Sequence, residues 1–338
     1  MTKTNALKVF EKEAHAASVQ QLEKLTKYML VEQFGDLIQQ FVSCFEGYCQ
    51  KIAKMQQTGE KGALGYIHFS LLYTDILVKK YQLRIDAYDK HYFADRVECV
   101  GIYDVGNICS FLDEFSETLF AQRKKYVYKV SVADVRQLVL EESAKYRAAI
   151  TELIRLALAQ ATQTSAYQDV LREEQFIISV GGFQDGSAIV YREDYSEKDA
   201  KNVRKMLEEG REAGYHYEIV DRLDLSGGKF QNILLTYSTG AGSDFSNSDC
   251  QNARILFCKF PEAIFKQVTL AGALVLGTDF SGATLEDVDF QGAKLYQVSF
   301  ENATLINVDF TKADAIAQMN LTNATLVNTI IPPKKVVS

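Results

Sequence analysis

Residues 283–310 read ATLEDVDFQGAKLYQVSFENATLINVDF, and a leucine or phenylalanine returns at every fifth position of this stretch. An alanine or valine stands two residues before each of them, so Ala-x-Leu alternates with Val-x-Phe. Both columns continue without a slip back to Ser243. The apolar column consists of Phe245, Cys250, Ile255, Phe260, Phe265, Leu270, Val275, Phe280, Leu285, Phe290, Leu295, Phe300, Leu305 and Phe310. A period of five fits neither a helix of 3.6 residues per turn nor the two-residue alternation of a strand.

A square coil satisfies this period. If each five-residue unit forms one side, four units complete a turn, and residues twenty apart stack at the strand spacing of about 4.8 Å. Large side chains would then fill the interior, small ones would fit the corners, and the remaining positions would face solvent. The pattern predicts two internal stacks, Phe245, Phe265, Leu285 and Leu305 in one, and Phe260, Phe280 and Phe300 in the other.

The motif of a small residue, a polar residue, Leu or Phe and two variable positions closely resembles the pentapeptide-repeat family. The resemblance implies a right-handed quadrilateral parallel β-helix, which we expect over residues 223–331 in about five coils. Gly240 is expected to break the pattern as part of a loop between coils. Because the downstream centres are shifted by one position, a one-residue bulge is expected near residues 315–319, with Ala315 as a weak centre. The shifted centres are Leu321, Leu326 and Ile331.

The remaining sequence predicts a multidomain α+β protein. Residues 1–172 are expected to form a mainly helical domain with a β-hairpin near residues 66–88, because apolar residues there recur mostly at threes and fours. Residues 173–222 are expected to connect the two domains through a second hairpin, turning at Gly181, Gly182 and Asp185-Gly186, and a charged helix over residues 196–213 that caps the β-helix. Residues 332–338 form a tail, in which Pro332, Pro333, Lys334 and Lys335 would stop further strand pairing.

Composition narrows the function classes. Of 338 residues, 47% are hydrophobic and 24% are charged, and the net charge is −7, which argues against general binding to nucleic acid or to anionic membranes. The sequence shows no targeting segment and no apolar run long enough to span a membrane. The six cysteines match no disulfide or zinc framework, so we expect reduced, mostly buried thiols and a cytoplasmic protein.

Motifs for catalysis or cofactor binding are weak. The four histidines have no i+4 partner and no nearby paired cysteine, so we expect no metal site and no cofactor. Gly181, Gly182 and Gly186 lack the Lys-Ser/Thr of a phosphate loop, and no GxSxG nucleophile motif occurs. Cys44 and Cys49, five apart on a predicted helix, are interpreted as core residues in preference to a redox pair. The run Arg123 to Lys125 is interpreted as the end of a helix.

One face of the predicted β-helix is a candidate binding surface. Asp249, Thr269, Asp289 and Asp309 are spaced by twenty, and Glu286 and Asp287 lie just before Asp289. Residues 223–331 carry 11 acidic and 6 basic side chains. Some pentapeptide-repeat proteins are acidic β-helices that mimic DNA and protect DNA gyrase from drugs, so the resemblance implies gyrase or another topoisomerase as one partner. A merely solvated face is the alternative.

These observations favour a non-catalytic protein that binds a protein partner on the flat faces of the β-helix, because such a fold offers wide faces and few concave pockets. Gyrase protection is the first alternative. Enzyme activity in the N-terminal region is the second, although no residue there is singled out by a motif.

Overall fold

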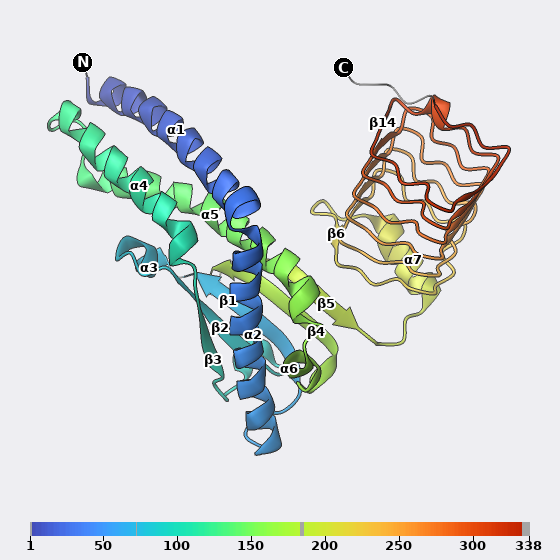
Figure 1. The fold of residues 1–338 in the computed structure, drawn as a ribbon, viewed down its shortest axis with the longest axis horizontal. Coiled ribbons are helices and arrows are strands. Elements are labelled where there is room, and N and C mark those ends of the chain that lie inside the picture. The colour runs from blue at the N-terminus through green and yellow to red at the C-terminus, as the bar shows by residue number, and fades with distance from the viewer. Residues whose placement is uncertain (1, 72, 183–185, 333–338) are drawn as a thin grey trace. The chain divides into compact units, whose positions relative to one another are not determined.

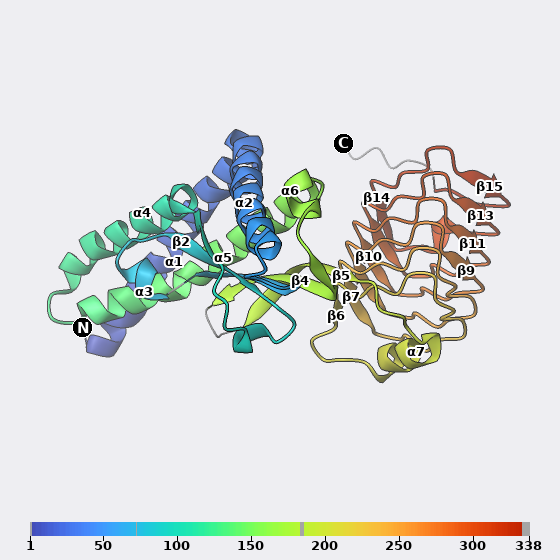
Figure 2. The ribbon, with the colours of Figure 1, turned by 90° about the horizontal axis from the view of Figure 1, so that it is seen from below.

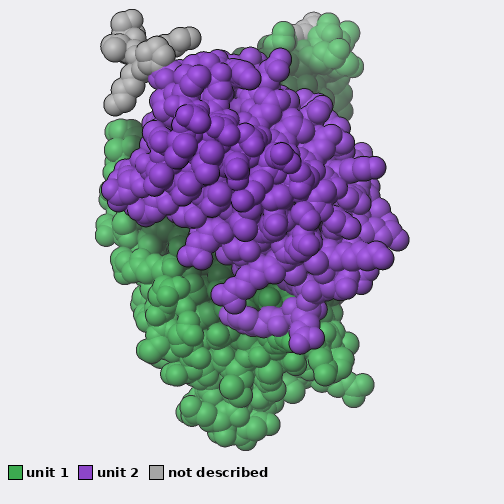
Figure 3. Space-filling model, turned by 90° about the vertical axis from the view of Figure 1, so that its right-hand side faces the viewer, with its two compact units in different colours: residues 1–194 green, residues 195–338 purple. Residues whose placement is uncertain are grey.

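The computed structural model describes residues 2–71, 73–182 and 186–332 (Figure 1). The chain divides into two compact units, residues 1–194 and residues 195–338, which Figure 3 distinguishes by colour. The first unit combines helices with a sheet and the second is a parallel β-helix, which confirms the predicted fold class. Within the described residues, the helices are too short or too polar to cross a bilayer.

Long helices dominate the first unit, as the apolar periodicity predicts. They are α1 (Lys3–Lys27), α2 (Phe34–Gln57), α4 (Gly106–Arg123) and α5 (Val132–Ala161), with the short α3 (Tyr73–Leu77) and α6 (Ser165–Gln168). A π-helix, η1 (Tyr28–Glu32), joins α1 to α2. The predicted cap of α5 is confirmed, since Ser131 and Asp134 form a capping box.

A five-stranded sheet completes this unit. Its strands are β1 (Leu64–Leu71), β2 (Gln82–Tyr88), β3 (Val100–Asp104), β4 (Arg172–Gly182) and β5 (Ser187–Asp194), in the order β3-β2-β1-β4-β5. Both predicted hairpins are present, as the antiparallel pairs β1–β2 and β4–β5. The central pair, β1 with β4, is parallel, and joins the two hairpins into one sheet.

The core of the first unit lies between this sheet and the helices. Phe41 of α2 packs its ring 5.7 Å from that of Phe69 of β1 and 5.3 Å from that of Tyr103 of β3. All three side chains are buried. Ile67, Phe69 and Leu71 share one face of β1, and His68 and Ser70, which are also buried, point to the other face.

The connecting region predicted over residues 173–222 is not a separate segment. Its hairpin belongs to the first unit, because β4 pairs with β1, and its helix belongs to the second. Gly181 lies in β4 opposite Ser187 and not in the turn. A Cβ atom on Gly181 would come within 2.7 Å of the Gly186 carbonyl oxygen, so glycine permits a close approach of the two strands. Asp185 lies outside the described residues.

The second unit is a square coil whose four sides are two parallel sheets and two columns of β-bridges. Figure 2 shows its turns stacked on one another. The six-stranded sheet stacks β6 (Tyr215–His216), β7 (Leu234–Thr236), β8 (Arg254–Leu256), β10 (Leu274–Leu276), β12 (Lys294–Tyr296) and β14 (Ala315–Ala317). The four-stranded sheet stacks β9 (Ile264–Lys266), β11 (Thr284–Glu286), β13 (Thr304–Ile306) and β15 (Thr325–Val327).

The five-residue period places its apolar column inside this coil. The rings of Phe245 and Phe265 stack at 5.1 Å, and those of Phe280 lie 5.6 Å from Phe260 and 5.4 Å from Phe300. Leu285 lies in register between Phe265 and Leu305, so both predicted stacks are confirmed. The small residues two positions earlier are buried as well. The residue two positions after each centre from Phe245 to Leu305 takes a positive φ, which explains why glycine and asparagine recur there.

The β-helix begins earlier than predicted and continues through Gly240. Tyr215 of β6 already pairs with Leu235 of β7, eight residues before the expected start at residue 223. Gly240 does not break the coil, because its N–H donates to the Lys259 carbonyl in the regular register. A Cβ atom on Gly240 would meet the Phe260 ring at 2.9 Å, so the ring fills the space that a side chain would occupy.

The one-residue insertion lies upstream of its predicted place. A 3₁₀ turn, η4 (Phe310–Lys312), absorbs the extra residue, and Leu295 then pairs with Ile316 in place of Ala315. After the turn, Ile316, Leu321 and Ile331 pack against the core, whereas Leu326 keeps the register opposite Leu305 but is 45% exposed. Of the residues predicted to stop the chain, Pro333, Lys334 and Lys335 lie outside the described part.

A helix covers the beginning of the β-helix, as predicted. It is α7 (Ala200–Glu209), shorter than the expected 196–213, with Asp199 as its N-cap. Leu207 is buried in the β-helix core, and Val203 and Met206 pack against that core. The apolar face of α7 thus covers the first coil, which protects the otherwise open end of the β-helix.

Candidate binding surfaces

The predicted acidic column forms one side of the β-helix. Parallel bridges place Asp249 opposite Thr269 and Thr269 opposite Asp289. Each Asp side chain accepts a hydrogen bond from the backbone N–H two residues later, at 3.0 Å for Asp249 and Asp289 and 2.9 Å for Asp309. A bond from the Thr311 hydroxyl, together with the one from the Thr311 N–H, lowers the pKa of Asp309. Such bonds stabilise the turn that follows, so the carboxylates have a structural role in the coil.

The column is not uniformly acidic. Lys229 precedes it in register and Ile330 follows Asp309. Thr269 interrupts the carboxylates, and its hydroxyl accepts a bond from the Ala271 N–H at 3.3 Å.

Glu286 and Asp287 belong to other parts of the coil than the bridge column. Glu286 lies on β11 with its carboxylate 3.2 Å from the Lys266 ammonium on β9. Asp287 occupies the next corner, with φ 54°, and accepts a bond of 2.9 Å from the Asn307 side chain. The structure therefore does not gather the six predicted residues into one acidic patch, and their role in binding a partner stays a prediction.

A different surface lies on the six-stranded sheet. We define the leucine face as Arg254, Leu256, Leu274, Leu276, Lys294 and Tyr296, which flank the buried centres of β8, β10 and β12. Leu256, Leu274, Leu276 and Tyr296 are half-buried, whereas Arg254 and Lys294 are exposed. None of the outward residues on these three described strands is acidic. The face is therefore flat, apolar and positively charged.

The leucine face is not among the surfaces predicted from the sequence, because that prediction rests on the inward column and on charge. A detectable signal exists, since Leu256 and Leu276 are twenty apart and each follows an inward centre directly. Comparing the outward columns of the four sides with one another would have distinguished this side from the polar ones.

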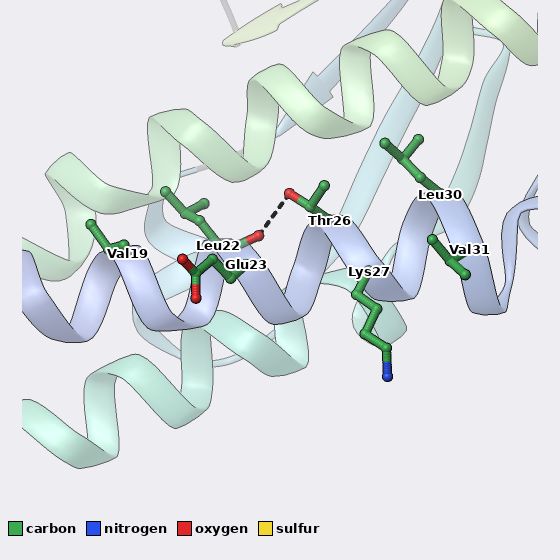
Figure 4. A pocket seen from close by; sticks show the side chains of 7 residues that line it. All are labelled: Val19, Leu22, Glu23, Thr26, Lys27, Leu30 and Val31. Carbon is green, nitrogen blue, oxygen red and sulfur yellow. Dashed lines mark hydrogen bonds between the residues drawn. The ribbon is translucent and has the colours of Figure 1, made fainter. Parts of the chain in front are cut away.

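A second apolar surface lies on α1 and η1 of the first unit. Figure 4 shows the shallow groove, lined by Val19, Leu22, Glu23, Thr26, Lys27, Leu30 and Val31. Leu30 is 61% and Val31 75% exposed, although both are apolar. Met29 of the same π-helix is buried, so the wide turn directs one apolar residue inward and leaves its two neighbours outside. No motif marked this surface in the sequence.

Polar groups also form a row across the sheet of the first unit. His68 of β1 lies opposite Asp86 of β2 on one side and opposite Ser179 of β4 on the other. The His68 Nδ1 atom is 2.8 Å from the Ser179 hydroxyl, but Asp86 accepts two bonds of 2.9 Å from Arg84. In the described part of the chain no hydrogen bond joins His68 to Asp86. The row therefore lacks the base-orienting bond of a Ser-His-Asp triad.

In the part of the chain that the structure describes, the cysteines are unpaired and no cluster of His, Cys, Asp or Glu forms a metal site. All six cysteines are free, and burial raises the pKa of Cys49, Cys109, Cys250 and Cys258 to about 12. Within the described ranges, no three His, Cys, Asp or Glu side chains come close enough together to hold a metal ion.

Comparison with known proteins identifies the family that the β-helix resembles. A family model described as pentapeptide repeats matches residues 263–302 and 285–316. Among solved structures, QnrB1, a plasmid-mediated fluoroquinolone resistance protein, is 14% identical over 34% of this chain and 68% of its own, with a TM-score of 0.21. A pentapeptide repeat protein from the Arabidopsis thaliana thylakoid lumen is 23% identical over 33% and 68%, with a TM-score of 0.20.

HetL, a pentapeptide repeat protein involved in heterocyst differentiation regulation from Nostoc sp. strain PCC 7120, is 13% identical over 40% of this chain and 94% of its own, with a TM-score of 0.14. The comparison with curated proteins gave no match. The period, the inward stacks and the family model agree, and the C-terminal region of this chain is a pentapeptide-repeat β-helix.

Proposed function

We propose that this chain is a non-catalytic scaffold that binds a partner protein through the leucine face of its β-helix. The observation that carries the proposal is a row of half-buried leucine and tyrosine side chains on the outer face of a regular, flat sheet. An apolar surface of this kind on a folded protein is typical of an interaction site. The closed hydrogen-bond ladder of the coil holds these side chains at fixed spacings, which reduces the entropy lost on binding.

The charges on the leucine face indicate the chemistry of the partner. Arg254 and Lys294 lie in one column on either side of Leu274, two coils apart, which corresponds to roughly 10 Å. A matching surface would bring apolar side chains against the leucines and place carboxylates opposite the two cations. The partner is therefore a protein with an acidic, amphipathic surface.

Two observations support a non-catalytic role. The carboxylate of Asp86 is engaged by Arg84, which leaves His68 without an orienting acid, and the high pKa of the buried thiols keeps them protonated near neutral pH. The six unpaired cysteines also support a reducing compartment, and we infer a cytoplasmic location.

The experiment captures proteins on the tagged full-length chain, purifies each one retained, and measures its direct binding. The test variant is Leu274→Ser with Leu276→Ser. The matched control is Ile264→Ser with Ile306→Ser, which removes two half-buried apolar side chains from the other sheet. We expect the test variant to weaken binding by about tenfold or more, and the control to leave it within about twofold. Equal binding by the test variant, equal losses in both variants, or failure of every purified protein to bind would refute the proposal.

The acidic column gives a second candidate function, binding to the cationic DNA channel of gyrase. What favours it is the regular placement of Asp289 and Asp309, both partly exposed, on one side of the coil. Lys229 and Thr269 in the same column weaken it. Under our proposal, micromolar protein leaves the supercoiling activity of purified gyrase unchanged. Inhibition that disappears in Asp289→Asn with Asp309→Asn would establish the second candidate in its place.

A further inference from the structure

The groove on α1 and η1 has a self-complementary sequence. Along the helix, two apolar residues, Val19 and Leu22, come first, then Glu23, Thr26 and Lys27, and then two apolar residues again, Leu30 and Val31. Figure 4 shows Glu23 and Lys27 between the two apolar ends. Reversing the direction of the helix exchanges the apolar ends and exchanges the acid for the base.

We infer that this groove binds the same groove of a second copy of the chain, with the two α1 helices antiparallel about a two-fold axis near Leu25 and Thr26. In that arrangement the numbers of two residues in contact, one from each copy, add up to about 50. Val19 of one copy meets Val31 of the other, and Glu23 meets Lys27, and the symmetry makes each contact twice. The inference concerns the first unit alone and does not rest on the proposed function.

The exposure of these residues in the single chain fits this arrangement. Leu30 and Val31 together form the most exposed apolar pair on α1 and η1, and Val19 is 43% exposed. The opposite side of α1 is already occupied, since Lys24 pairs with Glu114 of α4 at 3.0 Å and Ser18 donates to Glu142 of α5 at 2.8 Å. The groove is thus the side of α1 that remains available to another molecule.

The charges of Glu23 and Lys27 favour a second copy of the chain over a partner that offers only apolar side chains. Lys27 pairs with Glu32 at 2.7 Å, but both side chains are well exposed, so this bond contributes little to stability. The Lys27 ammonium has three donors and can contact Glu32 of its own chain and Glu23 of the other. Glu23 is exposed at the middle of the groove, where a parallel or shifted arrangement would place it against apolar side chains.

The interface is small, because it involves about four turns of one helix from each copy. Interfaces of this size are typical of weak or transient complexes. We therefore expect a reversible dimer with a dissociation constant in the micromolar range.

The test is sedimentation velocity of the full-length chain from about 1 to 200 µM, a range chosen for a weak interface. The wild type is expected to dimerise with rising concentration. Glu23→Lys places two pairs of like charges across the interface, and so does Lys27→Glu, so each variant should dimerise at least about tenfold more weakly. Glu11→Lys, the same charge change outside the groove, should leave the dissociation constant within about twofold.

A mixture separates the contact between chains from effects within one helix. A chain carrying Glu23→Lys and a chain carrying Lys27→Glu have complementary charges, so an equimolar mixture should dimerise where neither variant does alone. A wild type that stays monomeric up to 200 µM, single variants that dimerise like the wild type, or a mixture that stays monomeric would each overturn the inference. Circular dichroism of every variant checks that α1 remains folded.

Discussion

Replacing Phe280 by alanine tests whether the internal phenylalanine stack holds the β-helix together. The side chain is 1% exposed, and its ring has neighbours at 5.6 Å (Phe260), 5.4 Å (Phe265) and 5.4 Å (Phe300). Truncating a buried phenylalanine loses its transfer free energy and leaves a cavity, together about 3–5 kcal/mol. The coils above and below Phe280 cannot collapse into the cavity, because the hydrogen-bond ladder between coils fixes their backbone spacing. We therefore expect a loss near the upper end of this range.

The matched control is Phe257→Ala. This side chain belongs to the preceding coil but is 41% exposed, and its ring stacks on Tyr237 at 5.3 Å. Removing one aromatic contact at a half-exposed site should cost about 1 kcal/mol. Both substitutions delete the same atoms, so the difference between them reports burial inside the coil.

Equilibrium unfolding in guanidinium chloride, followed by circular dichroism, measures both losses. Hydrogen exchange of peptides from residues 215–331 assigns the transition to the β-helix. With a slope of about 4 kcal/mol per molar denaturant, the midpoint should fall by about 1 M for Phe280→Ala and by about 0.25 M for Phe257→Ala. Equal shifts of the two midpoints would refute the inward assignment of the period.

Two further predictions concern a glycine and a buried histidine. Gly240→Ala should destabilise the β-helix by about 1–3 kcal/mol, because its Cβ atom would meet the Phe260 ring. Gly47→Ala, in α2 with open space around it, should stabilise the first unit by up to about 1 kcal/mol. Thermal unfolding of both variants measures the two effects. Burial lowers the pKa of His68, so the folded chain binds fewer protons than the unfolded chain and loses stability as the pH falls below 6.5. His68→Gln should reduce this loss of stability. Unfolding midpoints of both proteins at several pH values measure the difference.

The β-helix could be predicted from the sequence because its period is enforced locally. Each inward residue, such as Phe265 or Leu285, is fixed by a coil of only twenty residues, and every coil repeats the same constraint. The insertion at Phe310–Lys312 was placed too late, since the sequence shows a shift only once the next clear centre, Leu321, appears. Ala315 and Ile316 are adjacent, and the sequence alone could not decide which of them points inward.

The sheet of the first unit was only partly predictable, because its central pairing is not local. The hairpins β1–β2 and β4–β5 follow from neighbouring apolar patterns, but nothing near β1 indicates that β4 joins it about 110 residues later. The short β3 carries Gly101, whose Cβ atom would lie 2.6 Å from the Tyr48 ring, so its packing needs a residue that disfavours strands. The two apolar surfaces were missed for another reason, since outward side chains follow no period that folding requires.

The central place of β4 affects the order in which the chain folds as it leaves the ribosome. β1, β2 and β3 can pair early, but one edge of β1 stays open until β4 has been synthesised, after α4, α5 and α6. Exposed strand edges attract other chains, so this interval is the one in which nascent copies are most exposed to aggregation. The β-helix has no such delay, because each new coil pairs with the coil just completed, and its helix α7 is made before the first of them.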